Sequence, residues 1–322
     1  MTASVLDKKM KTNKPEVGEF LKRNSAGILL IILLLYNAIF TRNFFSIGTI
    51  WTIIIQCCTI ILTGMAMTMV ISTGGIDISV GSMLAAGAVF SAVFLPLGLV
   101  PAILLSLILC GILGMISGFM VGKLLVSPMV VTLAMQILAR GIAQVVNDGK
   151  IIYIADEQYQ TLGQGRLFGI VPPQIVPIVI TAVLMYFIME KTVWGRRIQA
   201  VGDNPKAARL VGINSEWTII SVYLCSACLA AMAGIILASK VGAADGNSLG
   251  KLTELDAIAA VAIGGTSMSG GRAKVFGTVI GAIIMQLITI TVVMNNIQYE
   301  YAQIMKAIII IFAVFFQTEK KS

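Results

Sequence analysis

Residues 72–82 read S-T-G-G-I-D-I-S-V-G-S and separate two apolar stretches of the chain. The Gly-Gly pair ends the first stretch, because glycine readily adopts the backbone conformations that terminate a helix. Asp77 is a good N-cap for the second stretch, since its carboxylate suits the free amides and the positive end of a helix. Inside a membrane, such a break is tolerated only where protein or a wet cavity surrounds it. The segment therefore indicates a structural cap at a tight turn, a break that lines a pathway, or both.

A second interruption lies late in the chain, where residues 254–274 read E-L-D-A-I-A-A-V-A-I-G-G-T-S-M-S-G-G-R-A-K. Glu254 and Asp256 are placed to cap a short helix that the Gly-Gly pair at 264–265 would end. Asp77 and Asp256 each follow an aliphatic residue and open a short apolar helix. An odd number of spans separates them, so they would face opposite sides of the membrane, as in an inverted repeat. Chance similarity between two short segments is the alternative.

The whole chain is apolar enough for a membrane protein. Hydrophobic residues make up 57% of its 322 residues and charged residues 12%, whereas soluble domains are about a quarter charged. Because a span needs ~20 apolar residues, the apolar runs predict an all-α, polytopic membrane protein with about ten helices, some short or broken. The runs are 26–41, 50–72, 79–95, 99–122, 128–146, 173–189, 217–239, 254–266, 275–294 and 299–316.

The distribution of basic residues predicts the orientation. The net charge of +8 comes from Lys and Arg that flank the apolar runs, which favours a positive-inside bias over nucleic-acid binding. The bias predicts a cytoplasmic N-terminal segment at 1–25, a single transmembrane domain at 26–317 and a cytoplasmic tail at 318–322. Loop 147–172 would be extracytoplasmic and loop 190–216 cytoplasmic.

The sequence gives little support for an enzymatic function. The chain has no His, which removes His metal sites and Ser-His triads. Cys225 and Cys228 spell C-x-x-C, but within an apolar run they are better explained by helix packing. An intramembrane aspartyl protease would need two Asp in Y-D and G-x-G-D contexts, which are missing here. The glycine-rich stretches also lack the order of a phosphate loop. We expect no catalytic residue, no metal and no cofactor in this chain.

The cytoplasmic loop contains a candidate surface helix in G-D-N-P-K-A-A-R-L-V-G-I-N, residues 202–214. Asn204 is a plausible N-cap, Pro205 a favourable first residue, and Gly212 a helix end. An ordinary solvated basic loop is the alternative. Within or near the apolar runs, ionisable groups need a partner or an exit. We expect Arg140 to extend outward and Lys306 to pair only through a third helix.

Three segments together resemble motifs of the permease subunits of ribose-type ABC sugar importers. They are residues 73–82, 202–214 and 254–272, in the order and spacing of that family. The resemblance covers about residues 26–317 and implies a type II importer-like membrane domain. Relatives of this kind include ribose, galactofuranose, other monosaccharide and autoinducer-2 permeases.

The resemblance implies import of a ribose- or galactofuranose-like monosaccharide across the bacterial inner membrane. A separate ABC ATPase subunit would bind the ATP, an extracytoplasmic sugar-binding protein would deliver the sugar, and a second permease subunit, identical or homologous, would complete the pathway. The implied ATPase-coupling helix comprises Asp203, Asn204, Pro205, Lys206, Ala207, Ala208, Arg209, Leu210 and Gly212. The candidates for the translocation pathway are Gly74, Gly75, Asp77, Ser79, Glu254, Asp256, Gly264 and Gly265.

An ion-coupled secondary transporter of a small polar solute is the alternative function. Broken helices and a possible inverted repeat favour it, but the sequence lacks a clear cluster of coupling-ion ligands.

Overall fold

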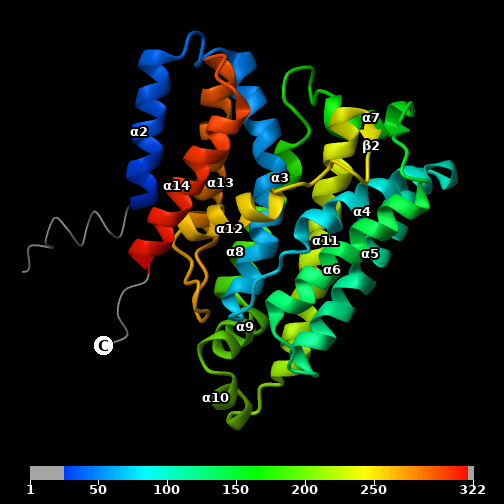
Figure 1. Ribbon diagram of the computed structural model, residues 1–322, viewed down its shortest axis with the longest axis vertical. Coiled ribbons are helices and arrows are strands. Elements are labelled where there is room, and N and C mark those ends of the chain that lie inside the picture. The colour runs from blue at the N-terminus through cyan, green and yellow to red at the C-terminus, as the bar shows by residue number, and fades with distance from the viewer. Residues whose placement is uncertain (1–24, 318–322) are drawn as a thin grey trace, which may run out of the picture.

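The computed structural model describes residues 25–317, which fold almost entirely into helices (Figure 1). The all-α prediction is confirmed. The predicted N-terminal segment, apart from Ser25, and the predicted tail lie outside the described residues.

The helices are α2 (Ser25–Phe40), α3 (Ile47–Ser72), α4 (Val80–Val93), η1 (Leu95–Leu97), α5 (Leu99–Gly122), α6 (Pro128–Val146), α7 (Glu157–Gln164), α8 (Ile175–Lys191), α9 (Val193–Asp203), α10 (Pro205–Leu210), α11 (Ser215–Val241), α12 (Thr253–Ile263), α13 (Val275–Met294) and α14 (Tyr299–Gln317). Two short strands, β1 (Ile152–Tyr153) and β2 (Ala243–Ala244), pair antiparallel.

Each apolar run predicted from the sequence is helical over most of its length. Among the described residues, α3, α5, α6, α11 and α13 are long and apolar enough to cross a membrane. The pair α8 and α9 meets the same test together and bends by 69° at its junction. Helices α2 and α4 are shorter apolar helices. The polytopic membrane class is therefore confirmed, while the number of spans stays a prediction.

Helices α3 and α11 form the centre of the bundle. α11 packs against α3, α4 and α5, and α3 also packs against α12 and α13. Small residues bring α5 close to α11: Gly114 faces Tyr223 and Ala227, and Gly118 faces Ile220. Close approach at small residues is the usual way in which membrane helices associate without a hydrophobic driving force.

The connecting segments divide between two ends of the molecule (Figure 1). Helices α9 and α10 lie at one end, which we call the α10 end, and α7 with β2 lies at the opposite end, which we call the α7 end. The link between α2 and α3 also lies at the α7 end. Loops 147–172 and 190–216 thus lie at opposite ends, while the side of the membrane that each faces stays a prediction.

Two short helices, α4 and α12, lie in the interior of the bundle. At ~1.5 Å per residue they are roughly 21 Å and 17 Å long, shorter than the ~30 Å hydrocarbon core. Their first turns touch, because a side chain added at Gly81 of α4 would collide with Glu254 and with the carbonyl of Gly250. The two interruptions of the sequence therefore meet in space. The inverted-repeat hypothesis itself stays a prediction.

Candidate translocation and coupling site

Asp77 ties the first interruption to the central helix α11. Its side chain is 2% exposed, so its oxygens need hydrogen-bond donors. Oδ1 accepts from the amide of Ser79 at 3.0 Å and from its hydroxyl at 2.5 Å, and Oδ2 accepts from the hydroxyl of Ser226 at 2.9 Å. Helix α4 begins at Val80, so Asp77 binds just ahead of the helix instead of capping it directly. These contacts make Asp77 and Ser79 parts of the scaffold around the break.

Glu254 and Asp256 do not take the capping role predicted for them. Helix α12 has Leu252 at its N-cap position, in a left-handed conformation (φ 62°) and without a side-chain capping bond. Glu254 instead accepts a hydrogen bond of 3.2 Å from Nε2 of Gln136 in α6. Its Oε2 is buried without a hydrogen-bond partner among the described residues. Both acids still lie in the first turn, where negative charge suits the helix dipole.

Arg140 finds its partners in backbone carbonyls of the segment between β2 and α12 and of α4. Its guanidinium donates to the carbonyls of Gly246 at 2.9 Å, Leu249 at 3.1 Å and Gly81 at 3.4 Å. Backbone carbonyls are suitable partners for a guanidinium that has left water. Arg140 thereby fastens the segment before α12 onto the start of α4.

Asp256 forms an ion pair with Lys306 of α14. Nζ lies 3.0 Å from Oδ1 and 2.9 Å from Oδ2, and the two side chains are 22% and 8% exposed. The predicted need of Lys306 for a partner on another helix is confirmed. A pair between α12 and α14 satisfies both charges, so neither is free to serve as an ion-binding group.

A junction of glycines joins both interruptions to α9. The carbonyl of Ser72, at the end of α3, accepts a hydrogen bond of 3.1 Å from the amide of Gly271. Gly202, near the end of α9, packs against both residues, and a methyl group on it would overlap the Ser72 carbonyl. A Cβ on Gly74 would lie 4.0 Å from the Gly202 carbonyl. We call these four residues the glycine junction.

The other predicted pathway glycines have packing roles. Gly264 ends α12 and packs against Gly277 of α13. Gly265 follows with a φ of 79°, next to Lys274. Gly75 lies under the hydroxyl of Tyr223, which a Cβ there would approach to 2.8 Å. Gly75 thus packs against α11, whereas Gly264 and Gly265 pack against α13 and the residue before it.

The surface helix predicted in the cytoplasmic loop is present as α10. The side chain of Asn204 accepts hydrogen bonds of 3.1 Å from the amides of Lys206 and Ala207. Leu210 is 89% exposed and Val211 75% exposed. The helix therefore presents an uncovered apolar tip beside basic residues.

The flanks of α10 fix it to α9 and α11. Asp203 ends α9, directly before the cap, and Ala208 is the buried residue of α10. Gly212 adopts a φ of 82° and ends the turn as predicted. Arg209 lies 3.6 Å from Glu216 of α11 across an exposed ion pair. The tip is thus exposed while its base is anchored.

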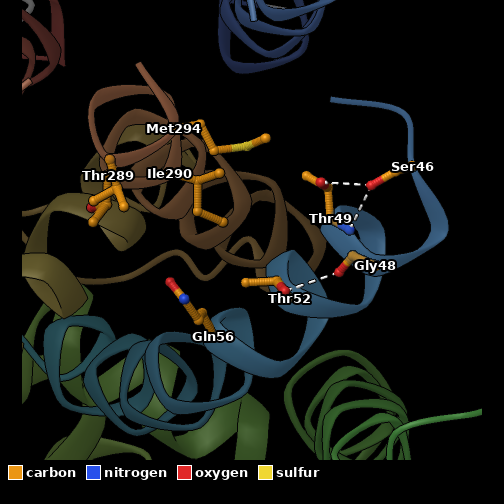
Figure 2. A pocket seen from close by; sticks show the side chains of 9 residues that line it. Ser46, Gly48, Thr49, Thr52, Gln56, Thr289, Ile290 and Met294 are labelled. Atoms are coloured by element: carbon orange, nitrogen blue, oxygen red, sulfur yellow. Dashed lines mark hydrogen bonds between the residues drawn. The ribbon is translucent and has the colours of Figure 1, made fainter. Parts of the chain in front are cut away.

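A cavity that the sequence analysis did not identify lies between α3 and α13 (Figure 2). Its volume is about 400 Å³. It is lined by Ser46, Gly48, Thr49, Thr52, Gln56, Thr289, Ile290, Val293 and Met294. The available signal was the spacing of hydroxyl and amide residues along one side of an otherwise apolar run.

Apolar helices around two central interruptions, with a capped helix protruding at one end, define a membrane transport component. The family described as "Branched-chain amino acid transport system / permease component" matches residues 49–314. The chain belongs to this family of permeases. The predicted resemblance to ribose-type ABC import permeases is also confirmed, and the chain is a transporter component, not an enzyme.

Curated relatives match nearly the full length of the chain. The ribose import permease protein RbsC of Haemophilus influenzae is 37% identical over 95% of this chain and 96% of its own length. The galactofuranose transporter permease protein YtfT of Escherichia coli is 34% identical over 91% and 89%. The fructose import permease protein FrcC of Rhizobium meliloti is 30% identical over 94% and 88%. No solved structure matches the chain significantly.

Proposed function

We propose that this chain is the permease through which a ribose- or galactofuranose-like monosaccharide is imported across the bacterial inner membrane. Curated relatives with this role in their names match it almost end to end. The family match also favours an ABC importer over an ion-coupled secondary transporter. The chain would form one transmembrane domain at 26–317, with both termini in the cytoplasm.

The exposed tip of α10 is the observation that carries the coupling part of this proposal. Leu210 and Val211 are uncovered at the end of a capped, anchored helix. Exposed apolar groups beside basic residues are typical of a protein contact surface. We assign this tip to the groove of an ABC ATPase subunit, with residues 203–212 as the coupling helix.

The two ends of the molecule would meet different partners. The α10 end carries the basic loop 190–216 and would face the cytoplasm. The α7 end would then receive the extracytoplasmic sugar-binding protein. A second permease subunit, identical or homologous, would pack beside this one in the membrane and complete the pathway.

Coupling would run from α10 through the glycine junction. The ATPase subunits bind and hydrolyse the ATP, and their closure would displace α10 and α9. Because Gly202 packs against Ser72 and Gly271, this displacement would reach both interruptions at once. Helices α4 and α12 would then move relative to each other and switch access between the two sides.

The test is ATP hydrolysis by the complex in liposomes, prepared from this chain, its ATPase and its binding protein. We expect the binding protein loaded with D-ribose or galactofuranose to raise hydrolysis and drive sugar uptake only when this chain is present. Hydrolysis that does not depend on this chain, or uptake driven by an ion gradient without ATP, would refute the proposal.

A further inference from the structure

The α3 wall of the cavity between α3 and α13 carries polar side chains, where a helix facing lipid would be apolar. Ser46, Thr49, Thr52 and Gln56 fall on one side of α3, since successive residues of a helix rotate by ~100°. Hydroxyl and amide groups on a membrane helix are stable where they meet protein or an aqueous cavity. This side of α3 lines the cavity, as Figure 2 shows for its labelled residues, and its polar groups suit a space that water can enter.

The cavity reaches from the α7 end toward the middle of the membrane. Gln56 lies nine residues after the first residue of α3, or ~14 Å along the helix. Its Oε1 accepts a hydrogen bond from Nε2 of Gln286 in α13. Gln286 lies eight residues before the end of α13, or ~12 Å. Gln56, the lining residue farthest along α3, thus lies at about half the thickness of a ~30 Å core, where its bond to Gln286 joins α3 to α13.

The hydroxyls of the cavity are prepared to accept hydrogen bonds. Thr52 donates to the carbonyl of Gly48 at 2.9 Å, and Thr49 donates to that of Asn43 at 3.1 Å. Because both donors are used, the oxygen of Thr52 offers its lone pairs to a ligand. The oxygen of Thr49 already has the hydroxyl of Ser46 at 2.9 Å and keeps one lone pair. Gln56 offers its amide hydrogens, for which no acceptor occurs among the described residues. A ligand rich in hydroxyl groups matches this pattern.

The wall of the cavity that α13 forms is mostly apolar and suits the apolar face of a sugar ring. Ile290, Val293 and Met294 line the cavity from α13, and they suit the C–H face of a furanose or pyranose ring. None of the lining residues carries a charge, so an uncharged ligand leaves no buried charge unpaired. The volume of about 400 Å³ lies within the ~300–1,000 Å³ usual for small-molecule sites.

We propose that this cavity is a monosaccharide-binding station on the outer half of the pathway, with Thr52 and Gln56 as contact residues. The inference rests on the proposed import function and adds the substrate contacts to it. It assigns the sugar contacts to the cavity and not to Asp77, whose oxygens already accept hydrogen bonds from Ser79 and Ser226. The open side of the cavity would be closed by the second permease subunit.

The experiment measures uptake of radiolabelled D-ribose and D-galactose into liposomes that contain the complete complex. The variants are Thr52→Val and Gln56→Leu, which keep the size of the side chain and remove the polar group. Thr59→Val is the matched control, because it lies on the same helix but does not line the cavity. We expect each cavity variant to lower uptake by about three- to tenfold, the usual effect of one lost hydrogen bond.

Single-deoxy analogues of the transported sugar identify a direct contact. If Thr52 binds a sugar hydroxyl, the analogue without that hydroxyl should be taken up equally well by wild type and Thr52→Val. The binding protein is the same in both reactions, so its own selectivity cancels. If Thr52→Val lowers uptake by the same factor for the full sugar and for every deoxy analogue, Thr52 makes no direct contact with a sugar hydroxyl.

Different results would refute the proposed import function and the proposed sugar-binding station. If the wild-type complex imports neither sugar and its ATPase does not respond to the loaded binding protein, the import function fails. If the wild type imports sugar and both cavity variants match Thr59→Val in uptake and selectivity, the station is wrong. The cavity would then be a contact for lipid or for the second subunit only.

Discussion

The carbonyl of Ser72 and the amide of Gly271 form a hydrogen bond of 3.1 Å, although about two hundred residues separate them in sequence. This bond joins the end of α3 to the loop between α12 and α13. Gly202 packs against the same pair from α9. The two interrupted segments and the helix that leads to α10 therefore share one point of contact.

The first prediction concerns Gly202. In Gly202→Ala, the new methyl group would overlap the Ser72 carbonyl and must push α9 away from the junction. We expect sugar-stimulated ATP hydrolysis and uptake to fall together while the chain still inserts. Gly141→Ala is the control, because a Cβ there meets nothing within 4 Å. Sugar-stimulated hydrolysis and uptake at the level of Gly141→Ala in Gly202→Ala would argue against transmission through the junction.

The second prediction concerns the tip of α10. Leu210→Asp places a charge on an exposed apolar position, so we expect loss of ATPase subunit binding with little change in the stability of the chain. Co-purification of the ATPase measures this. Phe168→Asp is the matched control, since Phe168 is 99% exposed but lies in the segment that leads into α8. A change at Ala208 would be less informative, because that residue is buried.

The third prediction concerns the ion pair between Asp256 and Lys306. Removal of one partner leaves a buried charge alone, so Lys306→Met should lower the free energy of unfolding by roughly 3–5 kcal/mol. The double variant Asp256→Asn with Lys306→Met should recover most of this loss. Thermal unfolding in detergent measures both. Additive losses in the double variant would show that the pair does not act as a unit.

The fourth prediction separates a scaffold role of Asp77 from ion binding. Asn keeps one carbonyl oxygen for the amide of Ser79, and the hydroxyl of Ser226 can rotate to accept from the new NH₂ group. We therefore expect Asp77→Asn to retain most uptake and Asp77→Ala to lose both stability and uptake, because it leaves buried donors unpaired. Uptake and thermal unfolding are measured on the same preparations. A loss of uptake in Asp77→Asn with normal stability would instead assign the negative charge a direct role in transport.

Local patterns in the sequence were sufficient to predict the helices of the fold. Hydrophobic runs identified the helices because membrane burial acts on each segment separately. The cap of α10 was also predictable, since Asn204 bonds only to amides two and three residues away.

Predictions failed where a side chain had a choice of partners. Asp256 could cap its own helix or bind a distant cation, and the structure pairs it with Lys306. Arg140 could reach water or backbone carbonyls, and it binds carbonyls of the segment before α12. A low dielectric interior favours the partner that is close in space, and sequence spacing does not give that distance.

The sequence by itself determined the membrane class, the helical segments, the two interruptions and the capped surface helix, since each depends on residues within a few turns. Only the tertiary structure decided that the interruptions meet at α4 and α12 and that Gly202 touches both at the glycine junction. It alone brought Thr52 and Gln56 together with Thr289 and Ile290 around one cavity. These relationships arise from the packing of α3, α9 and α13, which places side by side groups that the chain holds far apart.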